Sequence, residues 1–343
     1  MFRRVFLQLA FLCTIVAALG TSAYSQLLSG PTSPAPKTQP PPSDGDGLNV
    51  PPDQVEKIPR QEAILVKGAE PSASDHSTPV PEDGAVAKNI YQNSYFGITY
   101  PLPSDWTEAY KGPPPTDSGS YVLAQLIPAS SFKGPLKGTV LITAQDMFFS
   151  LTPTRSALDL IKFSRDHLPS FYEVERAPTE MKIAGHTFVR FDYKSAVAGL
   201  HWYVLATQIR CHAVQLVFTS QDTKLLESMI EDMNRMKLPD EGSAPDCVAG
   251  YATNANIVYK VDPVLTDHRF NQIPVRIIID KKGKVRHVHL LSAYPDQAAA
   301  ITDALMQWTF EPRMRDGKAV EIETGIVFRS RVSEAPKSTS TND

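Results

Sequence analysis

The stretch from Gln26 to Gly84 constrains this chain more than any other feature, because it contains twelve prolines and no Phe, Tyr or Trp. A segment without aromatic side chains cannot bury enough apolar surface to offset the entropy cost of ordering it. Proline also fixes φ and keeps the backbone open. The sequence therefore predicts a disordered, Pro-rich linker over residues 26–88 that acts as a tether, with the folded units after it.

The first 25 residues read as a secretory signal peptide. Arg3 and Arg4 form a positive region, residues 5–20 form an apolar run, and Ala23-Tyr24-Ser25 offers a small-x-small cleavage site. At ~1.5 Å per residue the run covers about 24 Å, which is short of a hydrocarbon core of about 30 Å. We therefore expect a periplasmic or secreted protein. The alternative is an uncleaved anchor in the inner membrane, with the chain facing the periplasm.

Two cysteines remain once the leader is removed, Cys211 and Cys247. Export permits disulfides, and closing a loop of about 37 residues would stabilise the fold by roughly 4 kcal/mol in the chain-entropy model. A pair would tie the end of one folded unit to the start of the next. The sequence leaves an equal alternative open, namely one buried small hydrophobe and one linker thiol.

Aromatic and β-branched residues begin at Tyr91 and predict a first folded unit over residues 89–238. Runs typical of strands cover residues 96–100, 121–127, 139–144, 180–193, 201–208 and 212–219, and helical periodicity covers residues 156–167 and 222–236. This order predicts an α+β sandwich of one antiparallel sheet with helices against it. The second helix has one apolar face, which we interpret as core: Leu225, Leu226, Met229, Met233 and Met236.

The start of this unit has an aromatic-Gly-aliphatic strand, Phe96-Gly97-Ile98, followed by Pro103-Ser104-Asp105-Trp106. This pattern resembles the opening of PsbP-like domains, and the order of elements fits as well. The resemblance implies a non-catalytic binding or scaffolding module and names no site residues. The alternative is a ligand-binding or hydrolytic protein with a site in this unit around Trp106, Tyr121 and His201.

Residues 250–331 have the pattern of a smaller ββαβ unit. Strands over residues 273–280 and 285–292 flank the turn Lys281-Lys282-Gly283-Lys284, whose glycine supplies a positive φ. Residues 296–308 predict a helix, and a last strand follows the turn Arg315-Asp316-Gly317-Lys318. Trp308, Phe310 and Pro312 are interpreted as packing residues that close the helix on the sheet.

Several spaced features of this unit are similar to the C-terminal domain of TonB-type energy transducers. They are Asp280 and Gly283 in the first turn, the second strand with Val285, Val288 and Leu290, the Trp-x-Phe-x-Pro exit from the helix and the Asp-Gly-Lys turn. The resemblance implies a periplasmic module that binds an outer-membrane receptor or transporter by strand addition, because an edge strand offers unpaired N–H and C=O groups. The implied pairing edge is Val320, Glu321, Ile322, Glu323, Thr324, Gly325, Ile326, Val327 and Phe328.

The chain also departs from the TonB pattern. The usual Tyr-Pro-x-x-Ala helix is replaced by residues 261–266, and the apolar leader lacks the polar His of a motor-coupled anchor. A true energy transducer with an uncleaved anchor is therefore kept only as an alternative.

No catalytic motif, metal site or cofactor site is predicted. His287 and His289 share one face of a strand, which permits metal binding, but no third ligand lies nearby in the sequence. We interpret them as a solvated outer face. The basic residues around the first turn, Lys281, Lys282, Lys284 and Arg286, are interpreted as a solvated hairpin, with an anionic partner as the alternative.

The predicted organisation is a signal peptide (1–25), a Pro-rich linker (26–88), a PsbP-like domain (89–238), a linker (239–249), a TonB C-terminal-like domain (250–331) and a disordered tail (332–343). The net charge of −3 gives no field that would attract nucleic acid. We expect a non-catalytic periplasmic or envelope protein that binds an envelope partner, with membrane contact only if the leader is retained.

Overall fold

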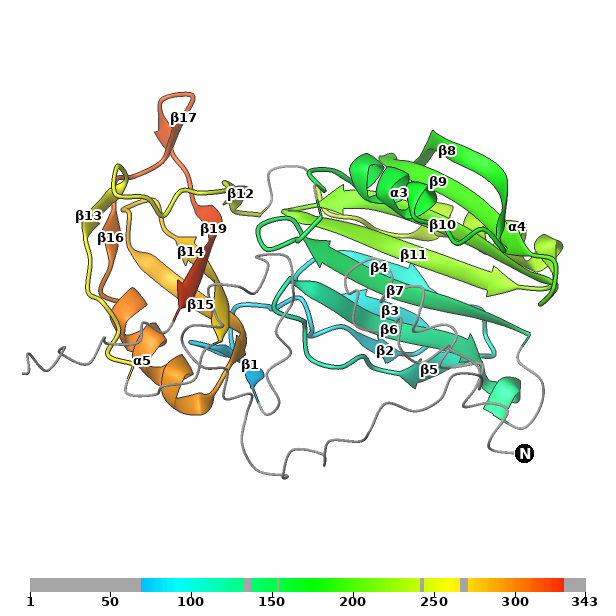
Figure 1. Ribbon diagram of the computed structural model, residues 1–343, viewed down its shortest axis with the longest axis horizontal. Coiled ribbons are helices and arrows are strands. Elements are labelled where there is room, and N and C mark those ends of the chain that lie inside the picture. The colour runs from blue at the N-terminus through cyan, green and yellow to red at the C-terminus, as the bar shows by residue number, and fades with distance from the viewer. Residues whose placement is uncertain (1–68, 133–136, 153, 241–243, 266–270, 330–343) are drawn as a thin grey trace, which may run out of the picture.

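The computed structural model of the chain describes residues 69–132, 137–152, 154–240, 244–265 and 271–329. The predicted signal peptide, the linker up to residue 68 and the predicted tail lie outside the described residues. Within these ranges no helix is both long enough and apolar enough to cross a membrane. Two units lie side by side, each a mainly antiparallel sheet with at least one helix against it (Figure 1), and the predicted α+β class is confirmed.

The first unit is built on a seven-stranded antiparallel sheet in the order β5-β6-β7-β11-β10-β9-β8. Its strands are β5 (Trp106–Tyr110), β6 (Ser120–Pro128), β7 (Gly138–Asp146), β8 (Glu173–Ile183), β9 (His186–Ser195), β10 (Leu200–Ile209) and β11 (His212–Ser220), and η2 (Ala129–Phe132) follows β6. The predicted single strand over residues 180–193 is wrong. Ala184 and Gly185 both take positive φ, 49° and 83°, and turn the chain into a hairpin there.

Different elements cover the two faces of this sheet. Helix α3 (Ala157–Asp166) packs on one face. Helix α4 (Thr223–Asp232), η3 (Met233–Arg235) and a small sheet of β2 (Ala85–Ala87), β3 (Ile90–Asn93) and β4 (Ile98–Pro101) pack on the other. The side chains of Ser156 and Asp222 cap the two helices by accepting backbone N–H bonds, 3.1 Å from Asp159 N and 2.9 Å from Lys224 N. The structure is therefore a sheet buried on both sides.

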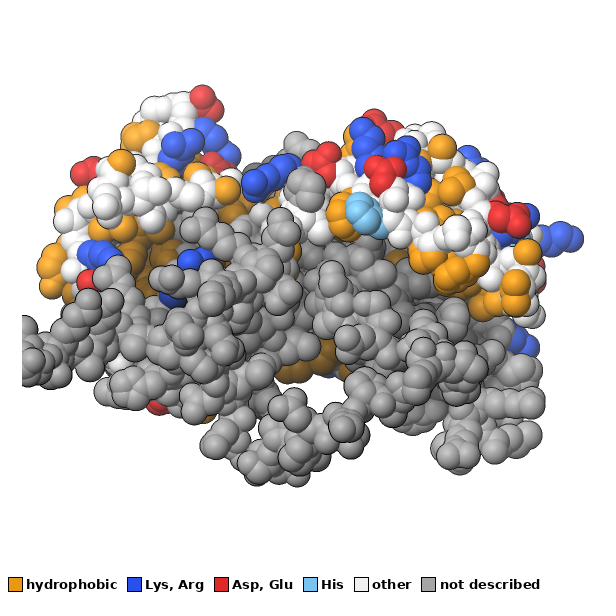
Figure 2. Space-filling view, viewed as in Figure 1, with side chains coloured by type: hydrophobic (Ala, Val, Ile, Leu, Met, Phe, Trp, Pro, Cys, Tyr) orange, Lys and Arg blue, Asp and Glu red, His pale blue; other side chains and the backbone are white. Residues whose placement is uncertain are grey.

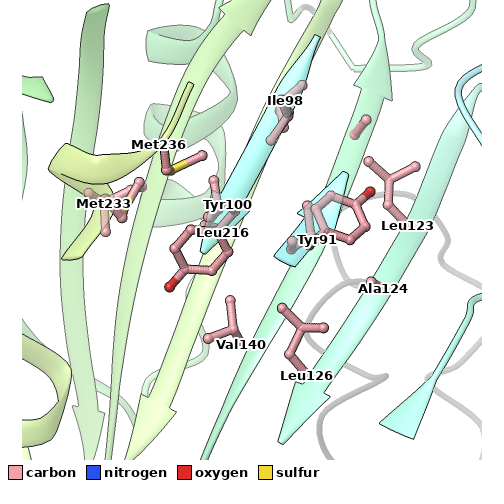
Figure 3. Packing of buried hydrophobic residues seen from close by; sticks show 14 of the residues in the cluster. Tyr91, Ile98, Tyr100, Leu123, Ala124, Leu126, Val140, Leu216, Met233 and Met236 are labelled. Carbon is pink, nitrogen blue, oxygen red and sulfur yellow. The ribbon is translucent and has the colours of Figure 1, made fainter. Parts of the chain in front are cut away.

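The larger core lies under the small sheet. Tyr91 and Tyr100 lie over β6, β7 and β11, where they meet Leu126, Val140 and Leu216, and Met233 and Met236 close one side (Figure 3). The methionines of the second helix were predicted to be core, and burial of Met229, Met233 and Met236 confirms this. The helix itself ends at Asp232, and η3 continues to Arg235, so the helical prediction runs a few residues too far.

The second unit has a five-stranded sheet in the order β1-β15-β14-β19-β12. Its strands are β1 (Glu70–Ala73), β12 (Asp246–Cys247), β14 (Gln272–Ile279), β15 (Val285–Ala293) and β19 (Ile322–Arg329), and α5 (Pro295–Leu305) packs on one face. Two short pairs, β13 (Ile257–Tyr259) with β16 (Thr309–Phe310) and β17 (Met314–Arg315) with β18 (Lys318–Ala319), complete the unit. The predicted ββαβ order corresponds to β14, β15, α5 and β19.

Gly283 fixes the turn between β14 and β15. Its φ is 78°, and a Cβ at this position would lie 1.9 Å from the carbonyl oxygen of Phe310, so both the conformation and the space require glycine. Asp280 Oδ1 accepts backbone N–H bonds from Lys282 and Lys284 at 2.8 and 2.9 Å. Trp308 and Phe310 are buried as interpreted, but Pro312 is exposed, so its packing role was wrong.

Two predicted linkers contain ordered strands. The Pro-rich linker was drawn to residue 88, but β1 and β2 lie within it, and β12 lies within the predicted linker 239–249. β1 pairs with β15, which comes much later in the chain. β1 therefore belongs to the sheet of the second unit, although the first unit follows it in sequence (Figure 1). The boundary at residue 88 was wrong because β1 is held by backbone pairing to the edge of β15, and β2 is held by pairing with β3 and by one side chain, Val86, that packs against the core.

Candidate functional site

The face of the five-stranded sheet opposite α5 packs against the first unit. Alternation along β14 and β15 sends Ile277, Val288 and Leu290 into the core under α5. Arg276, His289 and Leu291 occupy the intervening positions, and Leu291 belongs to the core of the first unit. Both faces of this sheet are therefore buried, although a sheet in a separate ββαβ domain would leave one face in water.

Arg276 is the centre of this interface. Its side chain is 1% exposed, its Nε donates to Glu323 Oε1 at 2.9 Å, and its Nη1 donates to Asp146 Oδ2. The guanidinium also lies 4.7 Å from the ring centroid of Phe148. Asp146 ends β7 in the first unit and Glu323 lies on β19 in the second, so one arginine bridges carboxylates of both units.

A second arginine approaches Glu323 from the first unit. Arg210 lies at the tip of the β10–β11 hairpin with φ of 54°, and its Nη2 donates to Glu323 Oε2. Its guanidinium stacks 3.9 Å from the ring centroid of Tyr95, whose hydroxyl donates to Glu323 Oε1 at 2.9 Å. Tyr95, Asp146, Arg210, Arg276 and Glu323 together form a group with two positive and two negative side chains, which we call the interdomain cluster.

Burial and charge act in opposite directions on the carboxylates of this cluster. Burial alone would raise the pKa of Glu323, but Arg276 and Arg210 outweigh it and lower the pKa to about 2. Burial raises the pKa of Asp146, and Arg276 opposes that shift. Each carboxylate faces a guanidinium, so the attraction between the buried charges offsets the cost of removing them from water.

His212 lies beside the cluster with no exposed surface. Its Nε2 is 3.6 Å from Asp146 Oδ2, beyond hydrogen-bond distance, and among the described residues neither ring nitrogen has a hydrogen-bond partner. The rings of Tyr95 and Phe96 pack edge-on against it at 5.4 and 5.0 Å. Burial and then the two arginines hold the pKa of His212 well below its ordinary value, so the imidazole is neutral.

His287 and His289 are buried, so their interpretation as a solvated face was wrong. The segment containing β1 covers them: His287 Nδ1 lies 2.7 Å from Asp75 Oδ2, and His289 Nε2 lies 2.8 Å from Glu82 Oε1. Each histidine therefore has one carboxylate partner. In the part of the chain that the structure describes, no group of three or more His, Cys, Asp or Glu side chains is placed to hold a metal ion.

Cys211 and Cys247 form a disulfide, with their Cα atoms 5.6 Å apart. Cys211 is buried at the tip of the β10–β11 hairpin, next to Arg210, and Cys247 is an exposed residue of β12. Of the two alternatives that the sequence left open, the structure has the pair. The same hairpin tip therefore holds the second unit in two ways, by a covalent bond to β12 and by an ion pair to β19.

The predicted pairing edge lies in β19, and its two halves differ. At the start of the strand, Ile322 and Glu323 pair in parallel with Asp246 and Cys247 of β12, so this half is already covered. Among the described residues, no strand pairs with the outer side of the half from Gly325 to Arg329. Val320 and Glu321, predicted as strand, precede it. The predicted edge is therefore open along only part of its length.

The direction of the backbone groups follows from the pairing with β12. Asp246 N donates to Glu321 O and Val248 N donates to Glu323 O, so odd-numbered residues present their backbone to the outer edge. Alternation places Gly325, Val327 and Arg329 in the same orientation. Pro274, the partner of Val327 in β14, has no N–H to donate, which agrees with this assignment. The open half therefore offers the backbone groups of three residues, with Val327 42% exposed.

The remaining predicted residues do not form a site. Trp106 pairs with Pro128 and Tyr121 pairs with Ala144, which puts them at opposite ends of β6, and both are buried in the apolar core. The structure therefore does not bring the predicted group of Trp106, Tyr121 and His201 together. His201 instead lies 2.7 Å from Glu175.

The basic hairpin is a surface feature. Lys281, Lys282 and Lys284 are exposed, and Arg286 Nε donates to Glu321 Oε1 at 2.9 Å. On the face shown in Figure 2, acidic and basic side chains lie next to each other where the surface is not covered by grey atoms.

Sequence reasoning missed four residues of the interdomain cluster, Tyr95, Asp146, Arg210 and Arg276, and it assigned the fifth, Glu323, to the pairing edge. Arg276 was visible as the only charged residue inside an otherwise apolar strand, 272–279, and Asp146 as the acid that ends the run 138–146. A charge within an apolar strand predicts either a solvated face or a buried ion pair. The sequence alone does not decide between these, because the partners lie 130 and 47 residues away.

No family model matches this chain, and no curated protein matches it. Among solved structures, the solution structure of cyanobacterial PsbP (CyanoP) from Synechocystis aligns with 48% of this chain and 98% of its own, at 12% identity and a TM-score of 0.30. A crystal structure from Bacteroides thetaiotaomicron aligns with 43% of this chain at 14% identity and a TM-score of 0.28, and the match spans 47% of that protein. Similarity at this level supports no conclusion about function, and the TonB resemblance stays a prediction.

Proposed function

We propose that this chain is an exported, non-catalytic protein that binds an envelope partner by adding a strand to the open half of β19. The observation that carries the proposal is the outward orientation of the backbone groups of Gly325, Val327 and Arg329, with exposed Val327 beside them. Unpaired backbone groups at a sheet edge bind an extended peptide through main-chain hydrogen bonds.

The disulfide supports export, since disulfides persist in oxidising compartments and are rare in reducing ones. We place the protein in the periplasm or outside the cell on this ground and on the predicted signal peptide. The partner class implied by the TonB resemblance is an outer-membrane receptor or transporter. The predicted tether would give the binding unit reach.

In this proposal the first unit is a rigid support. The interdomain cluster, the disulfide and the β1 segment all join it to the sheet that carries β19. An edge strand whose backbone is already ordered loses less conformational entropy when it binds than a mobile strand would. The open half offers only a few main-chain hydrogen bonds, at about 0.5–1.5 kcal/mol net each, so we expect weak and reversible binding.

The test is a substitution that removes one outward N–H. Val327→Pro removes a donor on the open edge and leaves the ladder to β14 intact, because Val327 and Pro274 are not a hydrogen-bonded pair. Val327→Ala is the matched control, since it shortens the side chain and keeps the N–H. Deleting the strand is not a usable test, because β19 is an inner strand between β14 and β12.

We expect envelope proteins captured by the wild-type chain and by Val327→Ala, and identified by mass spectrometry, to be absent from the Val327→Pro sample. Circular dichroism checks that the three chains are equally folded. Capture of the same proteins by Val327→Pro at wild-type levels would show that binding does not use this edge.

A further inference from the structure

β12 covers the half of the β19 edge that is not open. It is a two-residue strand, and its pairing occupies the outward backbone groups of Glu321 and Glu323, at 2.8 Å from Asp246 N and 3.0 Å from Val248 N. Without β12, five residues of the edge would face outward in place of three. The length of the edge that a partner strand can use therefore depends on whether β12 is in place.

Few described contacts hold β12 besides the disulfide. Asp246 makes an ion pair with Arg315, whose side chain is 53% exposed, and exposed pairs contribute little to stability, typically 0–1 kcal/mol. Val248 packs only partly against the core. The chain is anchored again at Tyr251, which is buried and whose hydroxyl donates to Glu311 O at 2.6 Å. The covalent bond from Cys247 to Cys211 is therefore the strongest described link on this strand.

The two cysteines differ in access. Cys247 is exposed on β12 at the sheet edge, and Cys211 is buried in the hairpin. Cys247 is therefore the side of the bond that a thiolate approaches from solvent, and exposure is a property of labile disulfides. Arg210, the neighbour of Cys211, would keep its ion pair with Glu323 after cleavage, so the two units would stay joined while β12 came free.

We propose that the Cys211–Cys247 disulfide is a reducible latch that sets the length of the β19 edge available to a partner. This proposal rests on the proposed function, because the latch would regulate the same β19 edge. In the oxidised form the edge has three outward residues, Gly325, Val327 and Arg329, and in the reduced form Glu321 and Glu323 extend it. The reductant is a dithiol, either small or a protein.

Thiol–disulfide exchange opens the latch in two steps. A thiolate of the dithiol attacks Sγ of Cys247, the bond between Cys211 and Cys247 breaks, and the electron pair leaves with Sγ of Cys211, which takes up a proton. The second thiol of the reductant then displaces Cys247 from the mixed disulfide and closes the reductant's own disulfide, and Cys247 takes up the second proton. Two electrons and two protons pass from the dithiol to the protein.

Hydrogen–deuterium exchange of the full chain tests the latch without a partner. With dithiothreitol, and in Cys247→Ser without it, we expect the amides of Asp246 and Val248, which donate to the carbonyl groups of Glu321 and Glu323, to exchange at least about tenfold faster than in the oxidised wild type, while β10 and β11 keep their protection. Arg315→Ala, which removes the ion pair of β12 and keeps the disulfide, is the matched control and should change the same rates by less than about twofold.

Unchanged exchange of the Asp246 and Val248 amides after reduction would overturn the latch. Equal acceleration in β10 and β11 would overturn it as well, because the disulfide would then stabilise the whole fold and not β12 alone.

Capture of envelope proteins with and without dithiothreitol separates this proposal from the proposed function. If Val327→Pro abolishes capture but reduction changes neither capture nor exchange, the edge is used and the latch is wrong. If reduction accelerates exchange of the Asp246 and Val248 amides but Val327→Pro captures as the wild type does, the latch stands and binding by this edge is wrong.

Discussion

The two faces of the five-stranded sheet are made by the same strands and bury different chemistry. The face under α5 is apolar, with Ile277, Val288 and Leu290 each 0% exposed. The face against the first unit carries Arg276, His289 and Glu323, and they are nearly as deeply buried. Apolar packing is non-directional and stabilises by area removed from water, whereas buried ion pairs are stable only in one geometry. We infer that the first face supplies the stability of the second unit and the other fixes its orientation on the first unit.

The largest expected effect comes from the polar face. Arg276→Ala should lower the free energy of unfolding by about 3–5 kcal/mol, because it leaves Asp146 and Glu323 buried without their shared partner. Urea denaturation of the full chain measures the change. The matched control is Arg286→Ala, which breaks the half-exposed pair with Glu321 and should cost less than about 1 kcal/mol. Equal costs for the two variants would show that the polar face has no special energetic role.

A substitution in the apolar face should lower the free energy of unfolding slightly less than Arg276→Ala does. Leu290→Ala should cost about 2–5 kcal/mol, the range for a buried leucine whose cavity only partly collapses, so its lower limit lies below that of Arg276→Ala. It should leave the interdomain cluster in place, so limited proteolysis should cut inside the second unit, whereas Arg276→Ala should expose sites between the units. Cleavage between the units in Leu290→Ala would contradict this division of roles between the two faces.

The smallest effect concerns a single carboxyl at the polar face and depends on pH. Burial raises the pKa of Asp117 to about 7, with a hydrogen bond from Ser292 of β15 acting against it. Among the described residues Asp117 Oδ2 has no hydrogen-bond partner. The folded state therefore holds a proton that the unfolded chain releases near pH 4. Stability from this group is fully present below about pH 4 and is lost as the pH rises to about 7, because the unfolded state binds fewer protons over that window.

Asp117→Asn removes this penalty. The variant should be more stable than the wild type at about pH 8, by on the order of 2 kcal/mol after allowance for partial exposure, and equally stable near pH 4. Thermal unfolding at the two pH values measures the difference. A wild-type chain whose stability is independent of pH over this window would show that Asp117 is ionised in the folded state without cost.

The sequence predicted local elements well and the contacts between units poorly. The alternation in residues 285–292 and the Lys-Lys-Gly-Lys turn predicted the β14–β15 hairpin, because both are determined by neighbouring residues. The same alternation predicted a solvated face for His287 and His289, which is the ordinary result for polar residues on a strand. What covers them is a segment more than 200 residues earlier in the chain, and no local pattern encodes that distance.

β1 shows the same limit in a segment where the sequence predicted a linker and the structure has a strand. Its sequence, Glu70-Pro71-Ser72-Ala73, has no β-branched or aromatic residue and predicts linker, yet it pairs with β15. β15 supplies an open sheet edge, and the backbone of β1 supplies the hydrogen bonds to it. The open half of β19 was foreseen as an edge from the family resemblance, but its covered half depends on β12, which sequence reasoning assigned to a linker.

The position of β1 also determines where mechanical load would enter the protein. The 68 residues that precede the described part of the chain lead directly into β1, which lies on the outer edge of the second unit and not on the first unit that follows it in sequence. Tension on that segment would pass along β1 into β15 and across the sheet towards β19, and it would bypass the seven-stranded sheet. The first unit would then serve as a brace beside the loaded sheet, and the two ends of the described chain, at β1 and β19, would act on one sheet.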